Sequence, residues 1–217
     1  MVIRLVLFGA PGAGKGTQAV LLEKHFGALH ISTGDLFRKA MKEKAALGDQ
    51  VRSYMDAGYL VPDEIVMNLV HQELVDVIKD NGFIFDGFPR TVPQAEAFSQ
   101  ILAKMNQSLT AVISLEVEQG LLVRRISGRR VCPKCAALYH VDTLINKEIC
   151  PIDHSTLEQR KDDAEDAVET RLKTFALQTL PLKEYYQEKN LLLQIDGSGS
   201  PDAVFARILS RLQPVFN

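Results

Sequence analysis

The residues with the clearest chemical meaning lie near the N-terminus, directly after the mainly apolar residues 2–8. The segment reads Gly9-Ala10-Pro11-Gly12-Ala13-Gly14-Lys15-Gly16-Thr17. Glycines let successive backbone N–H groups point inward at phosphate oxygens, and a helix that begins here adds the favourable end of its dipole. Lys15 adds a mobile positive charge for the outer phosphates. The segment therefore predicts a phosphate-binding loop.

This loop departs from the general pattern at one position. The pattern G-x-x-x-x-G-K-[ST] expects a hydroxyl directly after the lysine, but Gly16 stands there and Thr17 follows one residue later. A glycine-rich turn that merely ends a strand is the alternative. Four glycines and a Gly-Lys pair within nine residues argue against it. We expect a phosphate loop of a restricted subclass.

A second candidate follows another apolar run, residues 83–85. Asp86 ends that run and precedes Gly87-Phe88-Pro89-Arg90. In open parallel sheets, ligands bind outside the carboxyl ends of the strands. An aspartate at that edge beside a phosphate loop can hold Mg²⁺, directly or through water. A turn-forming aspartate is the alternative, and the phosphate loop favours the magnesium role.

Six arginines lie in segments that could border the same edge of the sheet. Planar guanidinium groups suit bidentate phosphate binding and the charge that develops during phosphoryl transfer. Arg125 and Arg129 are four residues apart, so they share a face if their helix continues. Spacing alone does not distinguish any of the six from a solvated surface charge. They are Arg38, Arg90, Arg125, Arg129, Arg160 and Arg171.

All three cysteines lie between residues 132 and 150, which in a reducing compartment indicates metal binding rather than disulfides. The sequence reads Cys132-Pro133-Lys134-Cys135 and then Cys150-Pro151-Ile152-Asp153. Two ligand pairs with this spacing are typical of a structural, tetrahedral zinc site, where a carboxylate is an accepted ligand. Asp153 keeps the spacing and is the preferred fourth ligand. His154 is the alternative fourth ligand. The alternative to a metal site is a set of three buried thiols with a surface aspartate.

Short apolar runs alternate with longer helical patterns, which predicts an α/β fold. We expect a doubly wound, five-stranded parallel sheet covered by helices on both faces. The runs are largely apolar, as in strands whose two faces are both buried. The expected strands are 3–8, 29–31, 83–85, 111–115 and 191–195, and the expected helices are 15–26, 34–57, 63–79, 93–105, 118–127, 164–188 with a break at Pro181, and 201–213.

Two segments interrupt the alternation. Residues 32–61 form a helical excursion, and residues 129–162 lack a sustained period and hold every cysteine. We interpret both as insertions on one core domain. The expected division is a core of 1–31, 62–128 and 161–217, a helical segment of 32–61 and a metal-binding lid of 129–160.

The composition of the chain limits the kinds of protein to which it can belong. With 217 residues, 46% hydrophobic and 24% charged, the chain is typical of a soluble globular protein. A net charge of −2 gives no reason to expect nucleic acid or an anionic membrane as a partner. No stretch approaches the ~18 apolar residues of a membrane span, and the apolar residues 5–8 are too few for a signal peptide. We expect a cytoplasmic protein.

Together these residues resemble the adenylate kinases, in the long-lid form with a metal-binding lid. The Asp-Gly-Phe-Pro-Arg block and the displaced threonine are specific to nucleoside-monophosphate kinases. The similarity covers nearly the whole chain. It rests on residues 9–17, Ser32-Thr33-Gly34-Asp35-Leu36-Phe37-Arg38, residues 86–90, Gly128-Arg129-Arg130, Arg160-Lys161-Asp162-Asp163 and Asp196-Gly197.

The resemblance implies reversible phosphoryl transfer from Mg·ATP to AMP, giving two ADP. The implied ATP site is Gly12, Ala13, Gly14, Lys15, Gly16, Thr17 and Arg129, with Leu138, Tyr139 and Gly199 beside the adenine. The implied AMP site is Thr33, Arg38, Leu60, Val61, Gly87, Arg90 and Gln94, with Arg160 and Arg171 reaching phosphates. The implied catalytic set is Lys15, Arg90, Arg125, Arg129, Arg160 and Arg171, with Asp86 holding Mg²⁺ through water.

The resemblance also implies a monomer whose lid closes over ATP and is folded by structural Zn²⁺ on Cys132, Cys135, Cys150 and Asp153. Tyr59 stands where relatives often have lysine, and Asp153 stands where the usual metal site has its fourth cysteine. A UMP/CMP or GMP kinase is the alternative within the class, and GTP is an alternative donor. A zinc-ribbon nucleic-acid-binding protein fused to a nucleotide switch is the alternative of another class.

Overall fold

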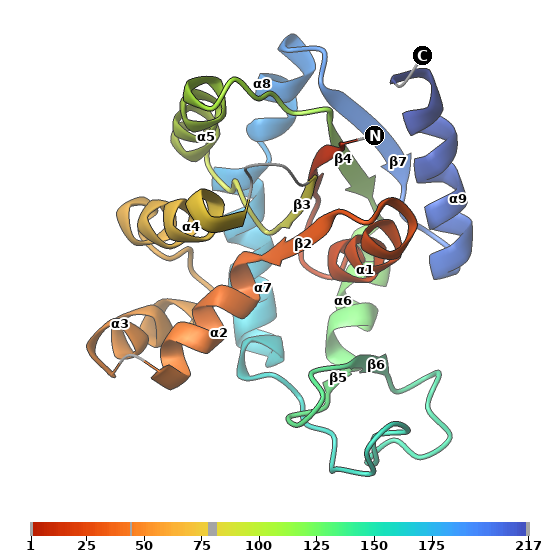
Figure 1. Cartoon of the computed structure of the whole chain (residues 1–217). Helices are drawn as coiled ribbons and strands as arrows, with labels where there is room; N and C mark the ends of the chain where they lie inside the picture. Colours follow the sequence, from red (N-terminus) through yellow and green to blue (C-terminus); the bar gives the residue numbers. More distant parts are fainter. Residues whose placement is uncertain (1, 44, 78–81, 216–217) are drawn as a thin grey trace.

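Five parallel strands form the centre of the fold (Figure 1). The computed structural model describes residues 2–43, 45–77 and 82–215. The strand order is β2-β3-β1-β4-β7, so the doubly wound five-stranded sheet that the sequence predicts is confirmed. The strands are β1 (Arg4–Phe8), β2 (Leu29–Ser32), β3 (Phe83–Asp86), β4 (Ala111–Glu116) and β7 (Leu192–Asp196).

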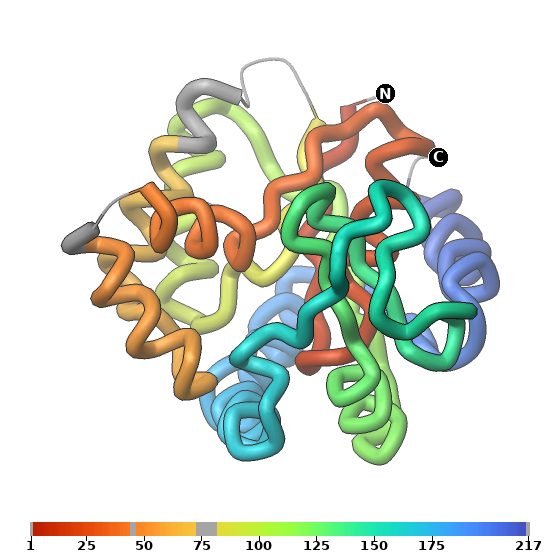
Figure 2. Tube along the Cα trace, turned by 90° about the horizontal axis from the view of Figure 1, so that it is seen from below, coloured from red at the N-terminus to blue at the C-terminus, as the bar shows by residue number. Residues whose placement is uncertain are grey.

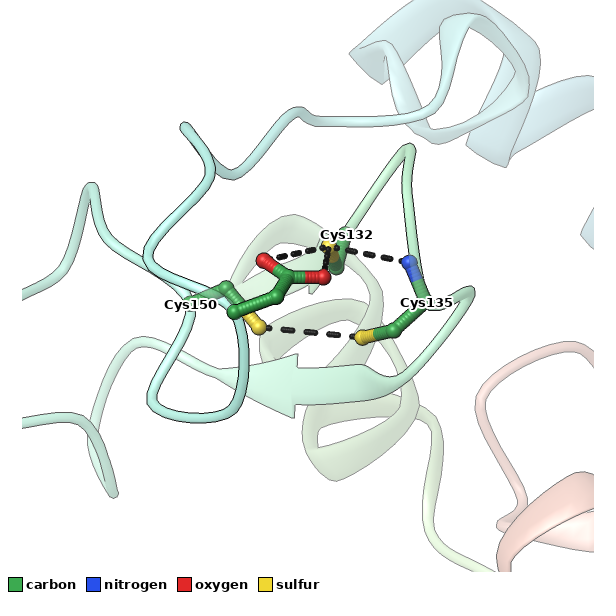
Figure 3. Close-up of side chains that lie close together, drawn as sticks. Cys132, Cys135 and Cys150 are labelled. Atoms are coloured by element: carbon green, nitrogen blue, oxygen red, sulfur yellow. Dashed lines mark hydrogen bonds between the residues drawn. The ribbon is translucent and has the colours of Figure 1, made fainter.

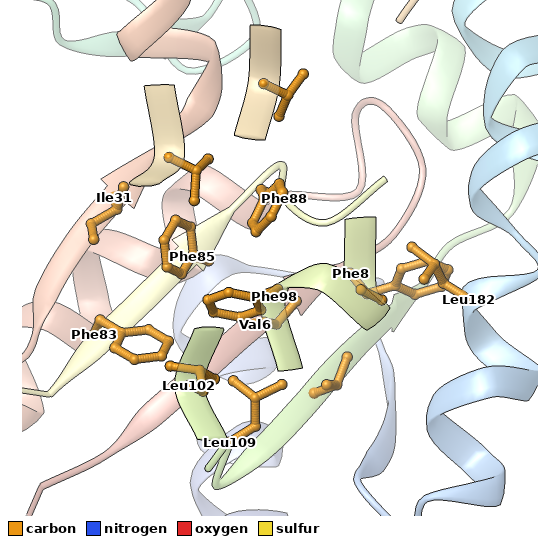
Figure 4. Packing of buried hydrophobic residues seen from close by; sticks show 14 of the residues in the cluster. Val6, Phe8, Ile31, Phe83, Phe85, Phe88, Phe98, Leu102, Leu109 and Leu182 are labelled. Atoms are coloured by element: carbon orange, nitrogen blue, oxygen red, sulfur yellow. The ribbon is translucent and has the colours of Figure 1, made fainter. Parts of the chain in front are cut away.

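Helices cover both faces of this sheet, because alternate residues of each strand point to opposite sides. Phe83 and Phe85 pack with Phe98 on one face (Figure 4). On the other face, Leu5 and Ile84 pack in a second buried cluster. The first face is covered by α4 (Asp63–Val77), α5 (Val92–Lys104) and α8 (Leu182–Glu188), and the second by α1 (Lys15–Phe26), α6 (Gln119–Ser127) and α9 (Pro201–Leu212).

The expected single helix over 34–57 is wrong, because the structure has two helices there. They are α2 (Thr33–Glu43) and α3 (Ala45–Asp56), which pack against each other and project from the core in Figure 1. Gly48 lies where the two meet, and a Cβ on it would come within 2.9 Å of the Ala40 carbonyl oxygen. Two short amphipathic helices can bury their apolar faces against each other, which one long helix cannot do. Residues 78 and 79 of the helix expected over 63–79 lie outside the described residues.

The cysteine-containing segment forms a separate loop-rich lobe beyond α6, nearest the viewer in Figure 2. Its strands β5 (Arg129–Val131) and β6 (Leu138–His140) pair antiparallel and are three residues long each. Strands this short give no detectable period in a sequence. We call this lobe, residues 129–160, the lid segment.

A nearly continuous helical stretch leads from the lid segment back to the core. It contains the 3₁₀ turn η1 (Lys161–Asp163), α7 (Glu165–Thr174) and a π-helical turn, η2 (Phe175–Thr179). Pro181 then precedes α8, so the expected break is confirmed. A 3₁₀ turn, η3 (Gln213–Val215), follows α9. Within the described ranges, no helix combines the length and apolarity needed to cross a membrane.

Candidate active site and metal centre

The predicted phosphate loop connects β1 to α1, so its expected strand–loop–helix context is confirmed. Gly12 and Gly14 have φ of 82° and 98°, a conformation that L side chains rarely adopt. A Cβ on Gly12 would also lie 2.8 Å from the Leu122 carbonyl oxygen. Lys15 folds back over the loop, where its Nζ donates to the carbonyls of Gly9 at 2.7 Å and Ala10 at 3.0 Å.

Lys15 is the centre of a convergence of charges from distant parts of the chain. Burial lowers the pKa of Lys15 to about 8; Asp86 opposes that effect, and the positive charges of Arg90, Arg171 and Arg129 add to it. Those four neighbours come from β3, the loop after it, α7 and β5. The sequence predicted a role for each of them, and the structure brings them together around one lysine. Such a group of cations attracts an anion.

Asp86 lies directly against the start of α1. A Cβ built on Gly16 would come 3.2 Å from Asp86 Oδ2, which is closer than ordinary van der Waals contact. His30 Nε2 lies 4.0 Å from the same oxygen. The glycine after Lys15 therefore leaves room for the carboxylate at the one position where this loop departs from the general pattern. A carboxylate oxygen beside a phosphate loop suits Mg²⁺, which prefers oxygen ligands.

Four of the residues implied for the AMP site form one hydrogen-bonded group. Thr33 Oγ1 donates to the Gly87 carbonyl at 2.9 Å, and Arg90 Nε donates to the same oxygen at 2.8 Å. The Arg90 backbone N–H donates to Gln94 Oε1 at 2.7 Å, and Gln94 Nε2 donates to Asp63 Oδ1 at 2.6 Å. Each end of the Gln94 amide keeps one further hydrogen-bonding position.

A cavity lies between the phosphate loop, the end of β3 and α7. Leu60 lines it, whereas the side chain of Val61 is buried in the core cluster around Phe85. Tyr59 is exposed. The residues that line the cavity and also carry predicted roles are Lys15, Leu60, Gly87, Arg90 and Arg171.

Acidic residues hold two of the predicted arginines. Arg129 Nε donates to Asp163 Oδ2 at 2.7 Å, and Arg171 Nη1 donates to Asp163 Oδ1 at 2.9 Å. Arg171 also pairs with Asp162 at 2.9 Å. The sequence places Asp163 among the acids at the start of a helix, where the dipole favours them, and Asp162 in a block shared with the family; it predicts no contact of either with the arginines. The acids lie close to two arginines in the sequence, Arg160 before them and Arg171 after them, and this clustering of opposite charges is the one signal that could have found them.

Two further predicted arginines lie close to this group. Burial lowers the pKa of Arg160 to about 10, and the positive charges of Arg38 and Arg129 contribute. Arg160 Nε is buried and has no hydrogen-bond partner within residues 2–43, 45–77 and 82–215. Arg38 pairs with Asp35, its neighbour one helical turn earlier. An anion that entered here would meet a guanidinium with a free donor.

Arg125 has a different position from the other arginines. Its Nη1 donates to the Gly197 carbonyl at 3.1 Å and its Nη2 to that of Gly199 at 3.4 Å. It thus supports the loop between β7 and α9, which includes one of the residues expected beside adenine. On the lid segment, Leu138 is exposed, whereas the hydroxyl of Tyr139 lies 3.4 Å from Cys150 Sγ.

The three cysteines and Asp153 converge in the lid segment (Figure 3). Their four ligand atoms all lie within 4.8 Å of one another, and His154 is not part of this group. Cys132 Sγ lies 3.2 Å from Asp153 Oδ2, and Cys135 Sγ lies 3.7 Å from Cys150 Sγ. Tetrahedral Zn–S bonds of about 2.3 Å place sulfurs roughly 3.8 Å apart. The donor set and its spacing therefore fit zinc.

Comparison with known proteins identifies the family to which the chain belongs. A family model described as adenylate kinase matches residues 7–191. The chain belongs to the adenylate kinase family. The adenylate kinase of Citrifermentans bemidjiense is 46% identical over 213 residues, which are 97% of this chain and 100% of that protein. The adenylate kinase of Carboxydothermus hydrogenoformans is 47% identical with the same coverage, and that of Methanocella arvoryzae is 45% identical over 215 residues, 97% of this chain and 99% of that protein.

These similarities extend over almost the whole chain and include both insertions. The predicted class, a nucleotide-binding kinase that transfers phosphoryl groups, is confirmed, as is the predicted phosphate-loop fold. The individual contacts between each predicted residue and a nucleotide stay predictions.

Proposed function

We propose that this chain transfers the terminal phosphoryl group of Mg·ATP reversibly to AMP, giving two ADP, and so balances the adenine nucleotides. The observation that carries the proposal is that Lys15, Arg90 and Arg171 line one cavity beside the phosphate loop, with Arg129 close enough for its charge to act on the same lysine. Such a set of fixed positive charges suits two phosphate chains that meet end to end. The family membership of the chain supports the same conclusion.

The reaction needs little covalent chemistry from the protein. The acceptor phosphate is already anionic near neutral pH, so no strong general base is required. In-line alignment and neutralisation of charge supply the rate enhancement. Lys15 would exchange its bonds to the carbonyls of Gly9 and Ala10 for phosphate oxygens. Asp86 would hold Mg²⁺ through water, and the bound ion would neutralise phosphate charge.

We assign the two nucleotides to opposite sides of the cavity. AMP would lie against Leu60, the backbone of Val61 and the hydrogen-bonded group of Thr33, Gly87, Arg90 and Gln94, with Arg38, Arg160 and Arg171 at its phosphate. ATP would occupy residues 12–17 with Arg129, and its adenine would lie against the backbone at Leu138 and Tyr139 and beside Gly199. Arg125 would act through that last loop, which it already holds.

The division into a core (1–31, 62–128 and 161–217), an AMP-binding segment (32–61) and a lid (129–160) remains our proposal. Closure of the lid segment over ATP would exclude water, which otherwise competes as acceptor. The lid segment is too small to hold a large core of its own, so Zn²⁺ on its four clustered ligands would fold it. We also propose a cytoplasmic monomer that needs no nucleic acid or membrane.

The proposed reaction can be tested in both directions with the purified chain. Mg·ATP and AMP together should yield ADP, and Mg·ADP alone should yield ATP and AMP in equal amounts. Release of inorganic phosphate without a nucleotide acceptor, at a rate similar to nucleotide turnover, would contradict the proposal.

Nucleotide binding should depend on pH through Lys15. Its pKa of about 8 in the free protein means that the lysine is charged below pH 8 and binds phosphate fully there. Above pH 8 it must take up a proton before it can bind. We expect Mg·ATP affinity to be about tenfold weaker at pH 9 than at pH 7, measured by calorimetry. Adenosine, which lacks phosphate, is the control and should show no such change.

Gly16→Thr should impair the enzyme although it restores the general phosphate-loop pattern. The new Cβ would lie 3.2 Å from Asp86 Oδ2 and push the carboxylate from its position. We expect the concentration of Mg²⁺ at half-maximal rate to rise about tenfold or more, as expected when a ligand-orienting contact is lost. Gly120→Ala is the control, because a Cβ on Gly120 meets open space. An unchanged Mg²⁺ requirement in folded Gly16→Thr would refute this role of Gly16.

A further inference from the structure

Asp63 is the first residue of α4, directly after the helical segment 32–61, and it contacts the start of α5. Its Oδ1 accepts from Gln94 Nε2 at 2.6 Å, and its Oδ2 accepts from Thr91 Oγ1 at 2.9 Å. Gln94 is only 2% exposed, so its amide cannot turn toward solvent. An acid from another helix therefore holds a buried side-chain amide of the implied AMP site.

The contacts of the Gln94 amide fix its direction. The Arg90 backbone N–H can only donate, so it must meet the amide oxygen, which lies 2.7 Å away. An aspartate carboxylate accepts and does not donate, so it must meet the amide nitrogen. Turning the amide over would bring donor against donor at Arg90 and acceptor against acceptor at Asp63. The protein thus sets the order of donor and acceptor before a ligand binds.

This order matters for the purine that the amide would meet. Adenine carries an amino donor at position 6 beside the N1 acceptor, whereas guanine and hypoxanthine carry an oxygen acceptor at position 6 beside an N1–H donor. The Gln94 amide keeps one acceptor position on Oε1 and one donor position on Nε2. For a base held in place by its ribose phosphate, one direction of the amide fits adenine and the reversed direction fits the 6-oxopurines.

We propose that Asp63 is a specificity-determining residue, which fixes the direction of the Gln94 amide so that the chain accepts a 6-aminopurine monophosphate and rejects a 6-oxopurine one. This inference rests on the proposed function, because it places the acceptor base against Gln94. Asp63 would touch no nucleotide and would act through the amide. A buried site with preset donors and acceptors rejects the reversed edge, because like groups would face each other without hydrogen bonds.

The test measures kcat/KM for AMP and for inosine monophosphate (IMP) at saturating Mg·ATP. IMP carries hypoxanthine, which lacks the 2-amino group of guanine. Asp63→Ala replaces the carboxylate by space for water, which can donate or accept and fixes no direction. We expect KM for AMP to rise about 10- to 30-fold with kcat within about threefold, and the preference for AMP over IMP to fall about tenfold or more. An unchanged preference in folded Asp63→Ala would overturn the proposal.

Thr91→Ala is the matched control, because it removes the other partner of the same carboxylate. Thr91 caps α5, where its Oγ1 accepts from the Gln94 backbone N–H at 3.3 Å. This variant should melt at a lower temperature but keep the preference for AMP over IMP within about twofold. A loss of preference equal to that of Asp63→Ala would show that Asp63 merely supports the start of the helix, and it would overturn the proposal.

Conservative variants separate the direction of the amide from the charge of the acid. Asp63→Asn keeps an acceptor for Gln94, and its amide nitrogen can donate to Thr91 Oγ1. It should retain most of the preference, and a preference as low as in Asp63→Ala would contradict the proposal. If Asp63→Ala does not fold, Asp63→Ser takes its place, since a hydroxyl can donate or accept. An unchanged preference in Asp63→Ser would equally overturn the proposal.

The wild-type chain separates this proposal from the proposed function. Transfer from Mg·ATP to AMP by the wild type tests the function alone. If the wild type prefers IMP, the proposed function fails in its acceptor, and Asp63→Ala should then narrow that opposite preference. Calorimetric binding of AMP and IMP gives the same ratio without turnover. Normal transfer to AMP together with an unchanged ratio in Asp63→Ala would refute the role of Asp63 and leave the function standing.

Discussion

Lys15→Met should slow phosphoryl transfer by about a hundred- to a thousand-fold or more, the range found when one preorganised charge-stabilising donor is removed. Lys15 is partly buried, and within the described residues the hydrogen bonds of its Nζ go to loop carbonyls. It is therefore free to bind phosphate when nucleotide enters. Methionine keeps the apolar stem but carries no charge. Steady-state kinetics at saturating substrates, with circular dichroism to confirm the fold, would measure the effect.

Lys24→Met is the matched control for that variant. Lys24 lies on the same helix, α1, but is exposed in its last turn. It should retain kcat within about twofold, as is usual for surface substitutions away from a site. A Lys15→Met enzyme that is folded and as active as the Lys24→Met enzyme would refute the role of the phosphate loop in the reaction.

Cys132→Ser should release zinc and unfold the lid segment well below the temperature at which the core melts. Cys132 is buried, and its Sγ lies 3.2 Å from Asp153 Oδ2 at the centre of the cluster. In a small metal-bound unit, much of the folding free energy comes from metal binding. Elemental analysis should give close to one zinc per wild-type chain, and calorimetry should resolve an early transition in the variant. No stoichiometric zinc in the wild type would refute the metal assignment.

His154→Asn is the control for the metal site. His154 lies beside Asp153 in sequence but outside the clustered ligand atoms, and its φ of 61° is one that asparagine tolerates. We expect this variant to keep its zinc, whereas Asp153→Asn should bind zinc more weakly.

The Cys132→Ser variant also tests whether the metal is purely structural. At temperatures where the lid segment of Cys132→Ser is still folded, catalysis should continue. Complete loss of turnover in that folded state would contradict a purely structural metal.

The features that the sequence predicts best are those encoded in consecutive residues. The phosphate loop, the aspartate that ends β3 and the two ligand pairs of the metal site each carry their chemistry within a few positions, and all are placed as expected. The parallel sheet follows from apolar runs such as residues 83–85, whose two faces are both buried in the structure. Patterns of this kind can be predicted because residues that are adjacent in the sequence are also adjacent in the folded chain.

The features that sequence reasoning missed depend on contacts between distant segments. Gln94 is held by Asp63, 31 residues away, and Arg129 by Asp163, 34 residues away. Nothing in their local spacing indicates these partners. The division into α2 and α3 was missed for a related reason, because Gly48 is required by the close approach of the backbone at Ala40 and Met41. The contacts of Arg125 with the carbonyls of Gly197 and Gly199 were also not foreseen, and its predicted role in catalysis stays a prediction.

The most direct test of the account is a coupled assay of the purified chain with Mg·ATP against AMP, UMP, CMP and GMP at equal concentrations. The buried Thr33 and the free positions on the Gln94 amide favour an adenine edge, which presents one donor beside one acceptor. We predict that kcat/KM for AMP exceeds that for each other monophosphate by at least about tenfold, the discrimination that one hydrogen-bonded pairing provides. A turnover with UMP, CMP or GMP far above that with AMP would contradict the central claim that phosphoryl transfer goes to AMP.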